Sequence, residues 1–115
     1  TWECSEVTAH WESDDVVVRA TVLNTGRRAG KFVGQIYASA PESALARPNR
    51  WLVGWGVVRA NAEESIPFEV RVPRVKLGHF DAGTGKYSLE DVAFQLALAT
   101  SSADSEATVT VTPQL

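Results

Sequence analysis

The chain has 115 residues, a formal net charge of −3 and 44% hydrophobic residues, which is typical of one soluble globular domain. The acidic balance and the shortness of the basic clusters argue against nucleic acid as a partner, because phosphate binding needs gathered Lys and Arg. No apolar run approaches the ~20 residues of a membrane-spanning helix, and the single cysteine, Cys4, allows no internal disulfide.

Alternating apolar residues predict strands from the start of the chain. Trp2, Cys4 and Val7 indicate a first edge strand, and residues 16–23 indicate a second. The second strand places four apolar residues on one face, because side chains two apart point the same way: Val16, Val18, Ala20 and Val22. Asn24-Thr25-Gly26 predicts a chain reversal, and residues 32–39 form the third predicted strand.

The middle of the chain alternates between irregular and extended patterns. Residues 40–49 contain two prolines and predict an irregular segment, after which residues 51–59 resume an extended pattern. A polar turn at 61–64 leads into residues 65–72, which alternate most cleanly. Their apolar face is formed by Ile66, Phe68, Val70 and Val72. Pro67 on the opposite face indicates an edge strand or a bulge.

The last third of the chain predicts four further elements. Residues 75–80 indicate a short connector strand or turn, and residues 81–86 a Gly-rich loop. Strands are predicted at 94–99, with Phe94, Leu96 and Leu98 on one face, and at 107–112. Seven or eight strands without a helical period predict an all-β fold. We expect a two-sheet antiparallel sandwich of fibronectin type III or immunoglobulin type, spanning residues 1–115 as a single domain.

The same residues resemble a known family. The pattern Asn24-Thr25-Gly26, Ala29-Gly30, Val33, Gln35, Tyr37 is similar to the fibronectin type III-like domain at the C-terminus of family 3 glycoside hydrolases, the β-glucosidases and β-xylosidases. Further motifs follow in family order: Trp2-x-Cys4-Ser5 before it, and after it Arg47-Pro48 with Leu52, Gly54 and Trp55, then Ser65, Phe68 and Val70, then Phe94, Leu96, Leu98 and Ser101–Asp104. The turn at 61–64 departs from the family by lacking Pro-Gly.

The resemblance implies a domain excised from the C-terminus of a larger enzyme. The absence of an initiator Met at the start, TWECSEV, fits a fragment or a processed chain. The resemblance also places the catalytic carboxylates in preceding domains, and it places Trp2 and Trp55 at core positions. The lone cysteine favours a reducing compartment such as the bacterial cytoplasm, with a secreted parent left open. Cys4 itself is expected to be a buried structural thiol, because no base is visible near it.

No catalytic, cofactor-binding or metal-binding residues are predicted within the chain. The acidic pairs at 14–15, 63–64 and 90–91 lie in expected turns, where adjacent carboxylates point apart instead of flanking a bond across a cleft. His10 and His79 have no partner at metal-ligand spacing. Residues 83–86 resemble the end of a phosphate-binding loop. The glycines are too close together for that motif and Lys86 is followed by Tyr, so a hairpin loop is the better interpretation.

The four tryptophans leave three interpretations open: contact with another domain, core packing, or stacking on a glycan. A surface for interdomain contact is predicted in the irregular segment and the start of the strand after it: Arg47, Pro48, Arg50 and Trp51. We therefore expect a non-catalytic accessory domain that braces the catalytic domains of its parent chain and contributes to a homo-oligomer contact. The alternative is a carbohydrate-binding or adhesion module that uses exposed Trp. A self-sufficient enzyme is the weakest hypothesis.

Overall fold

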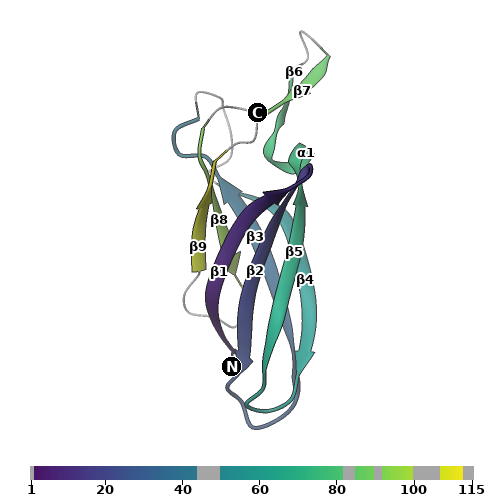
Figure 1. Cartoon of the computed structure of the whole chain (residues 1–115), viewed down its shortest axis with the longest axis vertical. Helices are drawn as coiled ribbons and strands as arrows, with labels where there is room; N and C mark the ends of the chain where they lie inside the picture. The colour runs from purple at the N-terminus through teal and green to yellow at the C-terminus, as the bar shows by residue number, and fades with distance from the viewer. Residues whose placement is uncertain (1, 44–49, 82–84, 90–91, 100–106, 113–115) are drawn as a thin grey trace.

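Two antiparallel sheets pack face to face in the computed structural model, which describes residues 2–43, 50–81, 85–89, 92–99 and 107–112 (Figure 1). The three-stranded sheet has the order β1-β2-β5 and the four-stranded sheet the order β4-β3-β8-β9. The strands of these two sheets are β1 (Trp2–Glu12), β2 (Asp15–Asn24), β3 (Gly30–Ser39), β4 (Trp51–Ala60), β5 (Ser65–Pro73), β8 (Phe94–Ala99) and β9 (Ala107–Val111). The predicted all-β, two-sheet antiparallel sandwich is confirmed.

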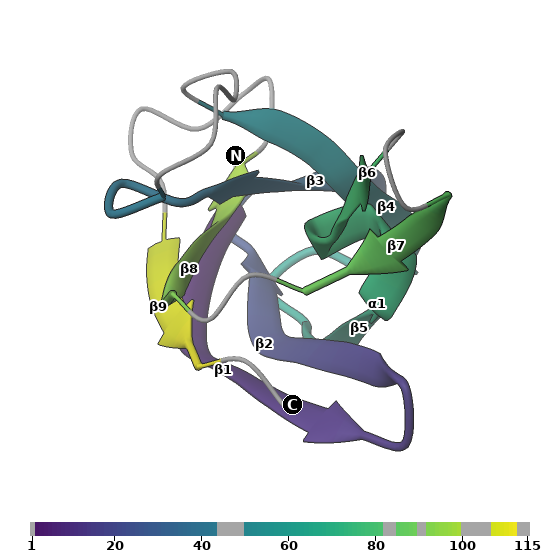
Figure 2. The same ribbon diagram turned by 90° about the horizontal axis from the view of Figure 1, so that it is seen from above.

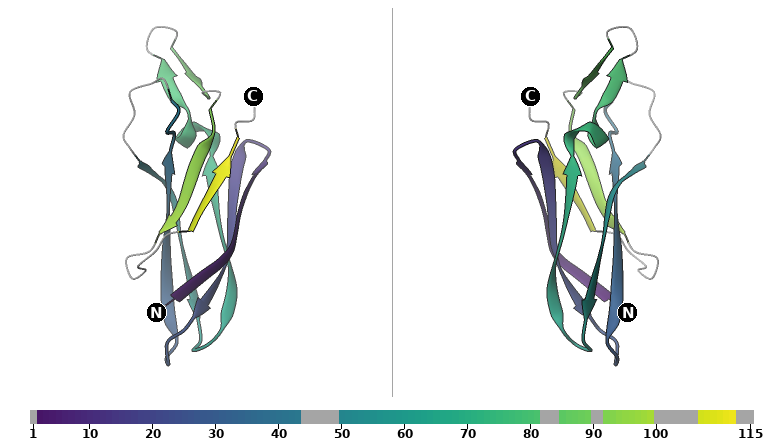
Figure 3. Two further views of the ribbon diagram at one scale, coloured as in Figure 1. Left: turned by 90° about the vertical axis from the view of Figure 1, so that its left-hand side faces the viewer. Right: turned by 90° about the vertical axis from the view of Figure 1, so that its right-hand side faces the viewer.

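A short helix and a small hairpin stand at one end of the sandwich. The hairpin pairs β6 (His79–Asp81) with β7 (Lys86–Ser88) and rises away from the two sheets (Figure 3). The expected strand or turn over 75–80 is wrong at its start, where α1 (Arg74–Leu77) forms a single helical turn. The amide of Arg74 donates to the Asp14 carbonyl at 2.9 Å, and the turn buries Leu77 in the end of the core.

The inward faces of the sheets form one apolar core. Every inward position predicted on β2 and β8 is buried, and on β5 Phe68, Val70 and Val72 are buried with Ile66 packed partly against them. The rings of Phe32 and Phe68 meet across the sheets edge to face, with centroids 5.2 Å apart. Gly34 has no side chain, and the two rings fill the space that a Cβ atom at this position would need. Figure 2 shows the sheets enclosing this core when viewed along the sandwich.

The predicted turn at Asn24 is hydrogen-bonded to the β4–β5 turn at the same end of the sandwich. The Asn24 side-chain oxygen accepts from the Gly26 amide at 2.9 Å, and its amide group donates to the carbonyls of Arg28 and Ala60 at 2.8 and 3.2 Å. The backbone amide of Asn24 also donates to the Glu64 carbonyl. Asn24 is buried, so these bonds satisfy a polar group that water cannot reach.

Ion pairs cover the outer face of the three-stranded sheet. Glu12 accepts from Arg19 at 3.1 Å and from Arg71 at 3.2 Å, and Arg19 also pairs with Glu69 at 3.0 Å. Val17 is fully buried on this face, where its strand register places it between His10 and Arg71. Alternation along β2 does not predict this buried position, because the burial of Val17 depends on long side chains from the two neighbouring strands. Pro67 lies on β5, which is an edge strand, as predicted.

Candidate docking surface

Three residues of the described acidic pairs form side-chain contacts at the surface. Asp15 pairs with Arg71 at 3.6 Å, and Asp14 lies 3.9 Å from Arg74. Glu64 accepts from the backbone amide of Asn61 at 2.8 Å within the β4–β5 turn. The third pair, residues 90–91, lies outside the described residues. Asp14, Asp15 and Glu64 thus contact turns and strand ends at the surface.

His10 has a carboxylate partner, Glu12, which was not predicted from the sequence. Its Nε2 atom lies 2.7 Å from Glu12 Oε2 and 3.2 Å from Arg19 Nη1. The hydrogen bond with His10 lowers the pKa of Glu12 below its usual value, and the positive charge of Arg19 and the hydrogen bonds from Arg71 and Arg19 act in the same direction. The spacing carried a usable signal, because residues two apart on a strand share a face. Among the described residues, no group of three or more potential ligands could hold a metal ion.

Cys4 packs against the core from the edge strand β1 and is half-buried. Burial raises the pKa of its thiol, which lowers the fraction of reactive thiolate at neutral pH. This agrees with a structural thiol, although the side chain is less enclosed than expected. No helix within the described ranges is long and apolar enough to cross a membrane.

Two shallow hollows lie at opposite ends of the sandwich. The larger, of about 450 Å³, sits beside α1 and is lined by Asp14, Asp15, Pro73, Arg74, Val75, Gly78 and Leu89. The smaller, of about 300 Å³, is lined by Ala29, Gly30, Arg59, Ala60, Asn61 and Glu64. The carboxylates of the larger hollow are paired with arginines, and Glu64 is bonded to the turn backbone. Neither hollow therefore presents two free carboxylates facing each other.

The predicted contact residues have different environments. Arg47 and Pro48 lie outside the described residues. The Arg50 guanidinium sits over the Tyr37 ring, 4.2 Å from its centroid. Trp51 packs partly against the core, and its indole N–H donates to the Lys76 carbonyl at 2.9 Å. Trp51 therefore joins β4 to α1, and an interdomain contact through these four residues stays a prediction.

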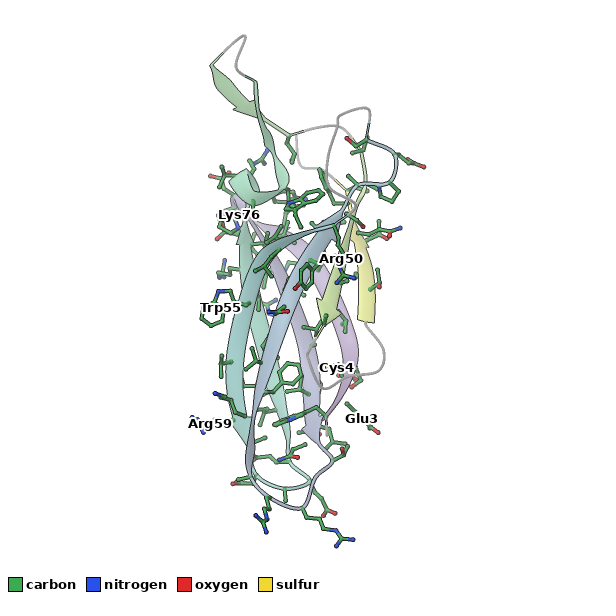
Figure 4. The ribbon with its side chains drawn as sticks, turned by 180° about the vertical axis from the view of Figure 1, so that it is seen from behind. Glu3, Cys4, Arg50, Trp55, Arg59 and Lys76 are labelled. Carbon is green, nitrogen blue, oxygen red and sulfur yellow. The ribbon has the colours of Figure 1, made fainter. Side chains whose placement is uncertain are left out.

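Trp55 is on the surface, with 65% of its area exposed, so the expected core position is wrong. The reason is a β-bulge, because Ile36 pairs with Gly54 and Tyr37 pairs with Leu52, which leaves Val53 as an extra residue on β4. One added residue reverses the side-chain alternation beyond it. Figure 4 shows Trp55 and Arg59 projecting outward from this strand.

Together these residues define a surface that we call the β3–β4 outer face. Tyr37 pairs in register with Leu52, Gln35 with Trp55, Val33 with Val57, and Lys31 with Arg59. Leu52 and Val57 are 48% and 45% exposed on either side of Trp55. The surface consists of Lys31, Val33, Gln35, Tyr37, Leu52, Trp55, Val57 and Arg59. Exposed apolar residues that gather in this way are typical of contact surfaces.

Comparison with known proteins places these features in a family. Residues 32–102 match the model of the fibronectin type III-like domain. The chain is 34% identical over 93 residues to beta-glucosidase B of Emericella nidulans, a match that covers 77% of this chain and 10% of that protein. It is 25% identical over 99 residues to a beta-glucosidase of Rhizobium radiobacter, covering 86% of this chain and 12% of that protein. The chain thus spans about a tenth of the length of these relatives.

Solved structures give the same result. The beta-glucosidase DesR from Streptomyces venezuelae superposes with a TM-score of 0.84 at 33% sequence identity, over 96% of this chain and 15% of that one. A beta-D-glucoside glucohydrolase from Trichoderma reesei superposes with a TM-score of 0.87 at 19% identity, over 97% of this chain and 18% of that one. The second likeness shows a shared fold. In both cases the match is confined to a small part of the larger chain.

Proposed function

Because the chain belongs to the fibronectin type III-like domains of family 3 glycoside hydrolases, we propose that it braces the catalytic region of a β-glucosidase-type parent enzyme. The observation that carries this proposal is the coverage of the relatives. The match covers 10–12% of two beta-glucosidases, so most of each of those chains lies outside it. The domain itself is non-catalytic.

The surface chemistry supports a bracing role. Leu52, Trp55 and Val57 form an exposed apolar group on a sandwich whose core is already complete. Covering such a group removes apolar area from water, at about 25 cal/mol per Å². A domain joined to its partner by the same chain avoids most of the entropic cost of association. The predicted contact through Arg47, Pro48, Arg50 and Trp51, and a contribution to a homo-oligomer contact, belong to the same proposal.

A carbohydrate-binding module is the second candidate, and the exposed Trp55 ring is the observation in its favour. Trp2, Trp11 and Trp51 are only partly exposed and pack against the core. A row of exposed tryptophans on one sheet is therefore not present. Titration of tryptophan fluorescence with cellulose or xylan oligosaccharides tests this candidate. A saturable shift at millimolar sugar would support it over bracing.

The bracing role is tested by deleting residues 1–115 from the parent enzyme. We expect a lower melting temperature and a lower soluble yield, since apolar surface on the catalytic region would become exposed. A truncated enzyme with unchanged activity and melting temperature would show that the domain braces nothing. As a control, the purified 115-residue chain should not hydrolyse a chromogenic glycoside.

A further inference from the structure

The free edge of β4 differs from that of its neighbour β5. Edge strands in soluble proteins usually carry proline or charge, which prevents pairing with other chains. β5 has these devices in Pro67, Glu69, Arg71 and Pro73. β4 has none from Trp51 to Val58, and its exposed side chains there include Trp55 at 65% exposure. A strand of this kind is protected from pairing with other chains when another surface covers it.

The two charged side chains of the β3–β4 outer face are both positive, and Glu63 and Glu64 follow β4 in the turn at the same end of the sandwich. Lys31 and Arg59 are directly opposite each other on β3 and β4, and the exposed Arg27 and Arg28 precede β3 at the same end of the sandwich. None of the four forms an ion pair within the described part of the chain. Like charges directly opposite on a sheet are destabilising. The fold therefore gains nothing from the Lys31–Arg59 pairing.

The two outer faces of the sandwich have different charge arrangements. On the three-stranded sheet, Glu12 and Glu69 compensate Arg19 and Arg71 at 3.0–3.2 Å. The β3–β4 outer face contains no Asp or Glu, although the chain as a whole carries a net charge of −3. Acidic side chains on a partner would compensate the positive charge that the chain leaves uncompensated.

We propose that the β3–β4 outer face docks onto an acidic protein surface of the same polypeptide, with Trp55 inserted in an apolar pocket at the centre of the contact. This inference rests on the proposed function and names the surface that performs it. Trp and Arg dominate the energetics of protein interfaces when an apolar centre is surrounded by charge. Here Trp55 and Val57 supply the centre, and Lys31 and Arg59 supply the charged border.

The same face is poorly suited to a sugar chain. Its second aromatic ring, Tyr37, is covered by the Arg50 guanidinium at 4.2 Å, so one ring face is not free to stack on a pyranose. Next to Trp55 are the aliphatic side chains of Leu52 and Val57, which pack well against protein. These contacts favour a protein partner.

The experiment measures oxidation of Trp55 by hydroxyl radicals in the full-length enzyme, with mass spectrometry of the β4 peptide. We expect Trp55 to be protected in the wild-type enzyme, despite its 65% exposure in the domain alone. The double variant Lys31→Glu/Arg59→Glu should oxidise at Trp55 at least about threefold faster, because the charged border would then repel the partner. The matched control, Lys76→Glu, reverses an exposed positive charge on α1 and should leave Trp55 protected.

Each remaining outcome either supports or overturns the docking of the β3–β4 outer face. If Trp55 oxidises as fast in the wild-type enzyme as in the charge-reversal variant, the docking surface is wrong. Protection that appears only after adding cello-oligosaccharide would assign the face to sugar instead and overturn the proposal. If deletion of the domain lowers the melting temperature while Trp55 is unprotected, bracing stands and occurs through another surface. If Trp55 is protected but deletion is harmless, docking stands without bracing.

Discussion

Gly34 on β3 is the position where one added methyl group should test the packing between the sheets. A Cβ atom at this position would lie 2.7 Å from Phe68 Cζ, 2.8 Å from Phe32 Cε2 and 3.0 Å from Leu98 Cδ1. All three neighbours are buried, and the two phenylalanine rings already meet edge to face. The Gly34→Ala methyl group therefore has no open space, and the rings must move to admit it.

The expected cost follows from two opposing terms. Overpacking a well-filled core costs about 1–3 kcal/mol. Replacing Gly by Ala within a strand recovers about 0.5–1 kcal/mol of conformational entropy. We expect the free energy of unfolding to fall by about 1–2 kcal/mol, which is a large share of the roughly 5–15 kcal/mol that stabilises a domain. For a domain of this size the melting temperature should fall by about 5–10 °C.

Urea denaturation of the 115-residue chain, followed by tryptophan fluorescence, measures this change. Gly30→Ala is the matched control on the same strand, because its Cβ would lie 3.5 Å from Trp2 Cζ2 and 3.9 Å from Asn24 Nδ2, which are ordinary contacts. This control should be neutral or slightly stabilising. Phe68→Leu removes the ring atom nearest to the new methyl group, so the double variant Gly34→Ala/Phe68→Leu should lose less than the sum of the single losses, by about 0.5–1 kcal/mol.

Two results would contradict the expected loss of stability in Gly34→Ala. One is a Gly34→Ala variant with the same free energy of unfolding as the wild type, which would mean that the two rings can separate freely. The other is strict additivity with Phe68→Leu, which would mean that the methyl group and the ring do not compete for space.

Three further predictions concern polar groups. Asn24→Ala should cost about 2–3 kcal/mol, because it leaves the buried carbonyl of Ala60 without its donor; thermal unfolding measures this loss. Trp51→Phe should cost about 1 kcal/mol by removing the indole hydrogen bond, whereas Trp55→Phe in the isolated chain should be neutral in urea unfolding. The lowered pKa of Glu12 means that its contribution to stability is present above the usual glutamate pKa and is lost as the pH falls through the lowered value, so Glu12→Gln should weaken the acid dependence of urea unfolding.

Each of these predictions has a contradicting result. An Asn24→Ala variant that melts with the wild type would show that water replaces the side chain. Equal losses from Trp51→Phe and Trp55→Phe would show that the indole hydrogen bond contributes nothing. Identical pH dependence in Glu12→Gln and wild type would show that the ionic network does not form in solution.

The family and the sandwich followed from the sequence because their signals are local. The alternating apolar residues of β2 predict its inward face, and each of them is buried: Val16, Val18, Ala20 and Val22. The turn at Asn24 is encoded by a side chain that bonds to its own backbone two residues on. Alternation and turn chemistry each depend on a few adjacent residues, so they can be read before the chain is folded.

The composition of the β3–β4 outer face required the tertiary structure, because strand pairing is not local. In the sequence WLVGWGVVR, strict alternation places both tryptophans on one face. The bulge at Val53 arises only where β4 pairs with β3, and it turns Trp55 outward while Trp51 stays against the core. The network around Glu12 has the same origin, since Arg19 and Arg71 arrive from other strands. Local patterns therefore specify the family and the layers, whereas the pairing of the strands selects which residues are exposed on each outer face.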